Sequence, residues 1–189
     1  MNGKRFFMNG DEWGLNSVLP AENADHFHEV VAAYRLHHKD TEFSPHGWST
    51  PPFVIPDPNV PISHRNIAVA DIGSILEFVM PQAVGVDSCV DFTGTPFPCP
   101  DCFAFASSLH NYWQCEGFYG EQIGGIVQSL HVTTFSVAPL QRTSFVDAIV
   151  KLGRQYDLLL FVNATHIVDL REPEAVRSFL DSGTSDSDT

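Results

Sequence analysis

The sequence predicts a single domain of the α+β class, with a largely antiparallel sheet and flanking helices. Its 189 residues are the length of one typical domain and can bury a substantial core. Hydrophobic residues make up 43% of the chain and charged residues 17%, which is ordinary for a folded protein. Strand and helix patterns are mixed with hairpin signals, and no internal repeat indicates a second domain. We therefore expect one domain over residues 1–180.

The last third of the chain carries the clearest pattern. Its β-branched and aromatic residues 132–137 predict a strand. A helix is expected over 143–156, with Thr143 as its N-cap. Two short apolar runs predict a hairpin over 158–170, and a proline at the start of 173–180 predicts a final helix there. This order of elements favours an antiparallel sheet.

The first third is less regular. Asn9-Gly10 is a strong turn signal and predicts a hairpin between residues 4–8 and 11–15. Apolar residues at helical spacing predict a helix over 20–38. Six prolines then exclude a helix or an inner strand from residues 39–65, so we expect a long Pro-rich loop there.

The middle of the chain predicts short elements. Residues 72–80 fit a short helix with Asp71 as its cap. Residues 119–130 also predict a helix, although three glycines weaken this interpretation. Strands are expected at residues 84–92, 103–105 and 112–113.

The chain is strongly acidic. Ten Lys and Arg residues oppose 23 Asp and Glu residues, so the formal net charge is −13. Such a surface repels the phosphates of nucleic acids, and it also repels anionic membranes. This repulsion excludes the binding of either one through a basic face of this protein. It would attract a basic protein and accelerate the encounter with it. The other interpretation, which the sequence leaves open, is that the charge only keeps the protein soluble.

Part of this charge lies at the C-terminus. Residues 181–189 contain three Asp residues and no apolar side chain, which predicts a disordered acidic tail. Without these three charges the net charge changes only from −13 to −10, so the folded domain is acidic as well.

No targeting segment is visible in the sequence. A secretory signal needs about 7–15 consecutive apolar residues, and the N-terminus offers only Phe6, Phe7 and Met8 before polar residues return. No apolar run approaches the ~20 residues of a membrane helix. We expect a cytoplasmic protein, in which the four cysteines remain reduced.

The sharpest motif is a C-x2-C pair. Two thiolates at this spacing can bind one tetrahedral zinc ion together with two further ligands. The candidate ligands are Cys99, Cys102, Cys115 and either His110 or Cys89. Apolar thiols packed near a turn are the first alternative, and a redox pair is the second. No motif indicates any other cofactor.

Two details limit the chemistry of this motif. The carboxylate of Asp101 disfavours a neighbouring thiolate, and residues 103–105 predict a strand and not a helix that would stabilise one, so a thioredoxin-type site is not expected. Residues 98–102 also match half of the signature of zinc nucleobase deaminases. No H-x-E motif supplies the third ligand and the proton shuttle, so we reject that activity.

No established catalytic motif occurs. A P-loop, a dinucleotide-binding G-x-G-x-x-G, a G-x-S-x-G elbow and an H-E-x-x-H helix are all missing. We therefore name no catalytic residue. A zinc-stabilised regulatory protein and an enzyme of unrecognised type remain the alternatives to a binding module.

One pattern of elements suggests a class of protein. The segment Tyr-Gly-Glu-Gln-Ile-Gly-Gly at residues 119–125, with the strand, helix and hairpin that follow, resembles the C-terminal half of small acidic immunity proteins. These are cytosolic bacterial proteins encoded beside polymorphic or contact-delivered toxins. The resemblance covers residues 118–180 and implies a protein that occludes a basic toxin domain without catalysis.

Four residues are candidates for contact with such a partner. Aromatic anchors and complementary charges dominate interfaces of this kind. The candidates are Trp48, Phe53, Glu116 and Glu121. For the two aromatic residues the alternative is that they pin the Pro-rich loop to the domain.

Overall fold

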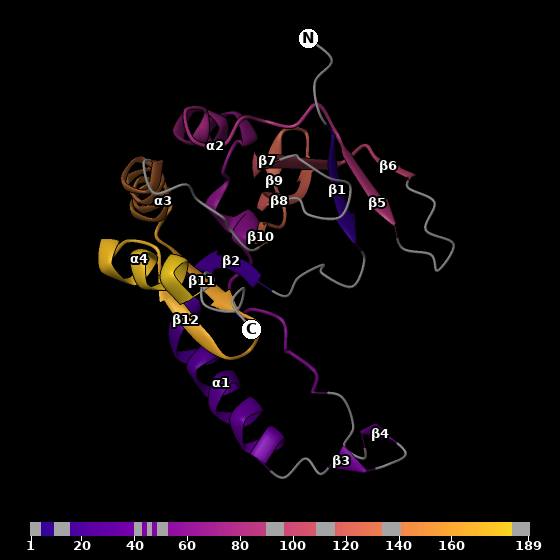
Figure 1. The fold of residues 1–189 in the computed structure, drawn as a ribbon, viewed down its shortest axis with the longest axis vertical. Helices are drawn as coiled ribbons and strands as arrows, with labels where there is room; N and C mark the ends of the chain where they lie inside the picture. Colours follow the sequence, from indigo (N-terminus) through magenta and orange to yellow (C-terminus); the bar gives the residue numbers. More distant parts are fainter. Residues whose placement is uncertain are drawn as a thin grey trace.

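The computed structural model describes residues 5–9, 16–39, 43–44, 47–48, 53–89, 97–108, 116–133 and 141–182. Within these residues lie four α-helices and a seven-stranded antiparallel sheet, arranged as one α+β domain (Figure 1). The predicted fold class is therefore confirmed. No helix in the described part of the chain is long and apolar enough to cross a bilayer.

The large sheet runs in the order β12-β11-β2-β10-β8-β7, and β9 pairs with β8 beside this path. Its strands are β2 (Asn16–Pro20), β7 (Cys102–Ser108), β8 (Glu116–Ile123), β9 (Ile126–Val127), β10 (His131–Val132), β11 (Leu158–Val162) and β12 (His166–Asp169). The predicted hairpin over residues 158–170 is confirmed, because Leu160 pairs with Val168 across it.

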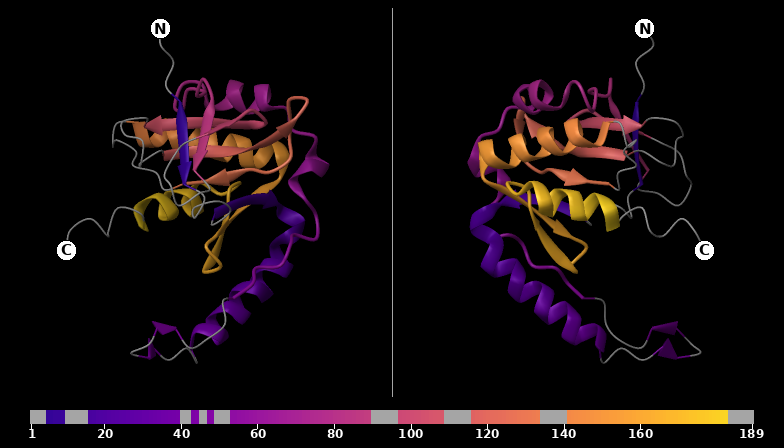
Figure 2. Two further views of the ribbon diagram at one scale, coloured as in Figure 1. Left: turned by 90° about the vertical axis from the view of Figure 1, so that its right-hand side faces the viewer. Right: turned by 60° about the vertical axis from the view of Figure 1, so that its left-hand side comes forward.

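Three helices cover one face of the large sheet (Figure 2). They are α2 (Val69–Leu76), α3 (Arg142–Tyr156) and α4 (Pro173–Ser182). Successive residues of a strand point to opposite faces, and on this face Phe105, Phe118 and Leu160 are buried with the helices in the main core. Burying one such side chain contributes roughly 1.5–3 kcal/mol, so this face supplies most of the stability of the fold.

A small three-stranded sheet packs on one end of the opposite face. It consists of β1 (Phe6–Asn9), β5 (Val86–Cys89) and β6 (Phe97–Cys99), in the order β1-β5-β6. The ring of Phe6 stacks on Tyr119 of the large sheet, with centroids 5.9 Å apart, in a core that includes Ala104. Arg5 donates from Nε and Nη2 to both carboxylate oxygens of the buried Asp87, each at 2.6 Å, which neutralises that charge.

Helix α1 (Ala24–Lys39) covers the other end of that face. It follows a short 3-10 helix, η2 (Ala21–Asn23), and buries Phe27, Val30 and Val31 against Leu159 and Phe161. Its second half extends beyond the sheet (Figures 1 and 2). Past its end lies the two-stranded β3 (Phe43–Ser44) and β4 (Gly47–Trp48), and the chain returns to a second 3-10 helix, η3 (Ile62–Arg65).

One predicted element is wrong and another is not tested. Strand β1 pairs in parallel with β5, about 80 residues away; residues 11–15, the second strand of the hairpin predicted at Asn9-Gly10, lie outside the described residues, so that hairpin stays a prediction. Residues 119–130 form the hairpin β8–β9 and not a helix. Gly124 and Gly125 make its turn, with φ of 59° and 83°, values that favour glycine.

The helix starts also differ from the prediction. Asp71 lies within the first turn of α2, whose N-cap is Ala68, and α3 begins after Gln141 with no side-chain cap from Thr143. Residues 181–182 belong to α4 and not to the expected tail, and residues 183–189 lie outside the described residues. The strand expected at residues 112–113 also lies outside them; of the strand expected at 132–137, Val132 belongs to β10 and residues 134–137 are not described.

Candidate partner-binding surface

Helix α1 and residues 53–61 together form a projection, which we call the arm. The segment 53–61 runs back along α1, because its first residue contacts the C-terminal half of the helix and Val60 contacts the residue before the helix. The arm extends away from the two sheets (Figures 1 and 2). It corresponds to the end of the predicted helix and to the second part of the predicted Pro-rich loop.

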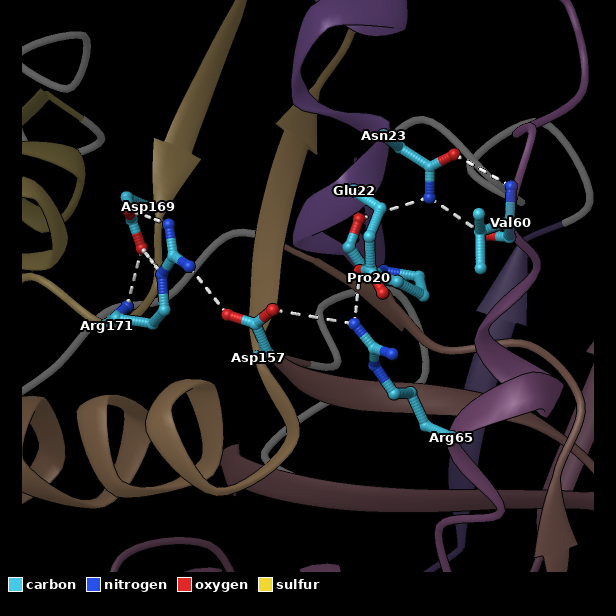
Figure 3. A network of polar contacts seen from close by, with 8 residues as sticks. All are labelled: Pro20, Glu22, Asn23, Val60, Arg65, Asp157, Asp169 and Arg171. Atoms are coloured by element: carbon cyan, nitrogen blue, oxygen red, sulfur yellow. Dashed lines mark hydrogen bonds and ion pairs between the residues drawn. The ribbon is translucent and has the colours of Figure 1, made fainter.

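One buried amide closes the base of the arm. Asn23 accepts a hydrogen bond from the Val60 N–H at 2.9 Å and donates to the Val60 carbonyl at 2.8 Å (Figure 3). Its Nδ2 also donates to the carbonyl of Pro20 at 3.1 Å. The side chain is fully buried, and its three hydrogen bonds in the described structure are all made to backbone groups.

A chain of alternating charges lies beside that amide (Figure 3). Arg65 pairs with Glu22 and lies 3.6 Å from Asp157, whose other oxygen is 2.6 Å from Arg171. Arg171 also pairs with Asp169 at 2.7 Å. The hydrogen bond from Arg65 lowers the pKa of Glu22, and that from Arg171 lowers the pKa of Asp169. These carboxylates are therefore neutralised locally and fasten the arm to the sheet.

At its distal end the arm is held by aromatic contacts. The ring of Phe53 lies 5.3 Å from Tyr34 and 5.5 Å from His37, and Tyr34 lies 4.2 Å from His38. Phe53 is half-buried in this cluster. Its side chain therefore pins residues 53–61 to α1, in agreement with the structural alternative for this residue.

The outer face of α1 is different in character. Asp25, Glu29, Ala32, Ala33 and Leu36 follow one another at helical spacing and all are exposed, with Leu36 at 64%. Neither Asp25 nor Glu29 forms an ion pair with any described residue. This face offers two carboxylates that pair with no cation of the described residues, and an adjoining apolar strip.

The returning segment packs on another side of α1, where Phe53 contacts Tyr34 and His37, and it carries exposed side chains of its own. Val54 is 81% exposed, which is unusual for a valine in a protein that has a large core. Ile55 and the carboxylate of Asp57 are exposed beside it. The arm thus carries apolar and acidic side chains on a part of the molecule that extends into solvent.

Other described carboxylates contrast with those of the arm. Six of them pair with arginine within the described structure: Glu22, Asp87, Asp157, Asp169, Glu174 and Asp181. The acidic surplus is therefore not one continuous patch. Carboxylates without a cation occur at several places in the described structure. Of these places, the outer face of α1 combines two such carboxylates with an exposed leucine.

The four predicted contact residues do not lie together. Trp48 belongs to β4, past the end of α1 (Figure 1). Glu116 is the first residue of β8, and Glu121 lies near the end of that strand. Strand β8 belongs to the part of the molecule formed by the two sheets with α2, α3 and α4, which we call the body. Glu121 is exposed and stands opposite Cys102 in the β7–β8 ladder. The side chains of Trp48 and Glu116 fall outside the described residues. Sequence reasoning missed Asp25, Glu29 and Leu36, which a helical wheel of α1 would have placed on one face.

The cysteine motif differs from the expectation of reduced thiols. Cys99 and Cys102 form a disulfide across the two-residue turn between β6 and β7, where their Cα atoms are 5.3 Å apart. Sulfurs joined in this way are not thiolate ligands for zinc. Cys115, His110 and the side chain of Cys89 lie outside the described residues, within which no group of three candidate metal ligands occurs.

Features of an enzyme are weak in the described structure. The Ser17 hydroxyl lies 3.2 Å from Nδ1 of His131, but burial lowers the pKa of His131 to about 4. A base with so low a pKa removes a hydroxyl proton poorly, so this pair lacks the property of a catalytic dyad. Among the described residues that line a surface groove of about 510 Å³ there is no serine, cysteine, threonine or histidine; they are Asp147, Val150, Lys151, Arg154, Gln155 and Pro173.

Comparison with known proteins adds no relative. No family model, no curated protein and no solved structure matches this chain.

Proposed function

We propose that this protein is a binding module for a basic protein, and that the outer face of α1 is its contact surface. The observation that carries the proposal is the pair Asp25 and Glu29, which are exposed and form no ion pair with a described residue, next to the exposed Leu36. Carboxylates left unpaired on a folded surface can form ion pairs with a partner at no cost in internal contacts.

The charge of the whole chain supports a basic partner. A net charge of −13 attracts a cationic protein over a long range and raises the association rate. It repels nucleic acids and anionic membranes, so neither is proposed as a partner. Leu36 and Val54 would supply the apolar anchors that charge alone does not provide.

The finer role that we propose is that of an immunity protein. The module would cover the basic surface of a cognate toxin domain and block it by occlusion, without catalysis and without a cofactor. Such a role requires the protein in the cytoplasm, where the toxin acts. The exposed carboxylates of Asp25, Glu29 and Asp57 on the arm support this proposal because a basic nuclease-type surface would meet them in place of phosphates.

The test uses the product of the adjacent gene as the probe. Calorimetric titration of the full chain with that protein should give a complex that weakens as salt increases. Asp25→Asn combined with Glu29→Gln should weaken it about tenfold, and Leu36→Ser by a similar factor. The matched control is Asp147→Asn combined with Glu172→Gln, which removes two exposed carboxylates from the body.

Two results would contradict the proposal. If the control pair weakened the complex as much as the arm pair, the contact would depend on net charge and not on α1. If the adjacent product did not bind at all, and the toxin remained active in the presence of this protein, the immunity role would be wrong.

A further inference from the structure

The disulfide lies at the junction of the two sheets. Cys99 ends β6 of the small sheet, Cys102 begins β7 of the large sheet, and Pro100 and Asp101 form the turn between them. Strand β6 pairs with β5 through Val86 and Cys99. The bond therefore closes the point at which the chain passes from one sheet to the other.

The two sulfurs differ in accessibility. Cys102 is only 8% exposed and belongs to the core formed with Phe6 and Tyr119. Cys99 is half-buried, and Pro98 and Pro100 on either side of it are exposed. An attacking thiolate from solvent can reach Cys99 and not Cys102, which gives the pair a defined direction of exchange.

This bond contributes little to the stability of the fold. The stabilisation by a disulfide grows with the length of the loop that it closes, and this loop has only two residues between its cysteines. Backbone bonds already hold the turn, since Gln122 N–H donates to the Asp101 carbonyl at 2.8 Å. The turn can therefore keep its conformation whether the sulfurs are bonded or not.

We propose that Cys99 and Cys102 form a reversible thiol–disulfide site whose reaction partners are dithiols. The inference does not depend on the proposed binding role. The short turn between the two sheets and the greater exposure of Cys99 favour a site that is reduced and reoxidised in the folded protein.

The exchange is balanced in two steps. A thiolate of the dithiol attacks Sγ of Cys99, the bond from Cys99 to Cys102 breaks, and Cys102 leaves with the electron pair and takes a proton from water. The second thiol of the reductant then attacks the sulfur that the reductant contributes to the mixed disulfide. This closes a disulfide within the reductant and releases Cys99. Two electrons pass to the protein, and the reductant leaves as a cyclic disulfide.

The surroundings of Cys102 make this site slow. Its thiolate would form in an apolar core beside the carboxylate of Asp101, and both features disfavour an anionic sulfur. The pair is therefore expected to be a target of dithiols and not an oxidoreductase, which agrees with the sequence argument against a thioredoxin-type site.

The first test measures the pair in the full folded chain. The protein is equilibrated with oxidised and reduced dithiothreitol in varied ratio, quenched with acid, alkylated and mapped by peptide mass spectrometry. We expect alkylation of Cys99 and Cys102 to rise together along a two-electron curve, and to reverse when the oxidised form is added back. Alkylation that begins only in denaturant, or that never reverses, would overturn the proposal.

The second test examines direction. With oxidised glutathione, Cys102→Ser should form a mixed disulfide at Cys99 about tenfold faster or more than Cys99→Ser forms one at Cys102. Circular dichroism of both variants checks folding. If either variant fails to fold, the rates of glutathionylation at Cys99 and at Cys102 are compared in the reduced parent protein instead. Equal rates at the two sulfurs would contradict the assigned direction. Stoichiometric zinc bound to free Cys99 and Cys102 in the isolated protein would replace the proposal by a metal site.

Discussion

Asn23 makes two hydrogen bonds to one residue 37 positions away: its Oδ1 accepts from the Val60 N–H and its Nδ2 donates to the Val60 carbonyl. A backbone segment paired in this way is fixed in position and direction, as if by a strand. The relationship sets where residues 53–61 rejoin the body, and so determines that the arm is a closed projection.

Asn23→Ala should destabilise the protein by about 2 kcal/mol, because it removes a fully buried amide and leaves the partly buried N–H and carbonyl of Val60 without their side-chain partner. Urea unfolding measures the change, and limited proteolysis should cut the arm faster than the body. The control, Gln155→Ala, removes an exposed amide and should change stability little. Equal losses in the two variants would mean that Asn23 does not close the arm.

Gly120→Ala should destabilise the fold by at least about 3 kcal/mol. An added Cβ would lie 1.9 Å from the carbonyl oxygen of Ser129, a backbone atom in the short connection between β9 and β10 that cannot move without displacing the chain there. Gly73→Ala is the matched control, since its Cβ would meet only the Phe105 ring, at 3.4 Å from Cε1 and 3.7 Å from Cζ, within a helix that favours alanine. Thermal unfolding should separate the two, and a stable Gly120→Ala protein would refute the close approach.

The protein should lose stability as the pH falls from about 6.5 to about 4. Burial lowers the pKa of His131 from 6.5 to about 4, so in this range the unfolded chain takes up a proton that the folded chain does not. The full loss corresponds to roughly 3 kcal/mol. Urea unfolding at several pH values measures it.

His131→Gln should flatten that pH profile, because it removes the imidazole and keeps a polar partner for Ser17. The control is His28→Gln, which removes an imidazole from the exposed surface of α1. If the parent and His131→Gln lost stability in parallel, the loss would have to be assigned to other groups.

Arg171→Gln should cost about 1 kcal/mol at neutral pH, since the ion pairs of Arg171 are partly exposed and screened by water. Arg171 lowers the pKa of Asp169, so this stabilisation is present above the ordinary Asp value of 3.8 and is lost as the pH falls below it. The difference between parent and variant should therefore close in acid and shrink in salt. Arg177→Gln, whose pair with Glu174 lies within one helix, is the control. An effect of Arg171→Gln that persisted in acid would indicate lost packing and not lost charge.

Local patterns in the sequence were sufficient for much of the fold. The helix α3 with its inward Val146 and Ile149, the hairpin β11–β12 and the helix α4 each depend on contacts between near neighbours in the chain. Apolar periodicity records such contacts directly, because residues three or four apart share a helix face and alternate residues share a strand face. The α+β class follows from the order of these elements.

The surfaces with candidate functions were less accessible to prediction. Three features depend on how the elements are arranged in the tertiary structure. They are the disulfide, the separation of the predicted contact residues between arm and body, and the outer face of α1. Of these, the face of α1 alone had a local signal, the helical spacing of Asp25, Glu29 and Leu36. Nothing in the spacing of Cys99 and Cys102 distinguishes a zinc ligand pair from a disulfide.

The sequence by itself determined the class of the fold, the acidic charge and the amphipathic elements of the C-terminal third, since these follow from composition and from short-range periodicity. Only the tertiary structure decided that β1 pairs in parallel with β5, that residues 119–130 are strands, and that Asn23 holds Val60. The physical reason is that each of these depends on the geometry between segments far apart in the chain, where backbone groups must find partners and glycine permits close approach.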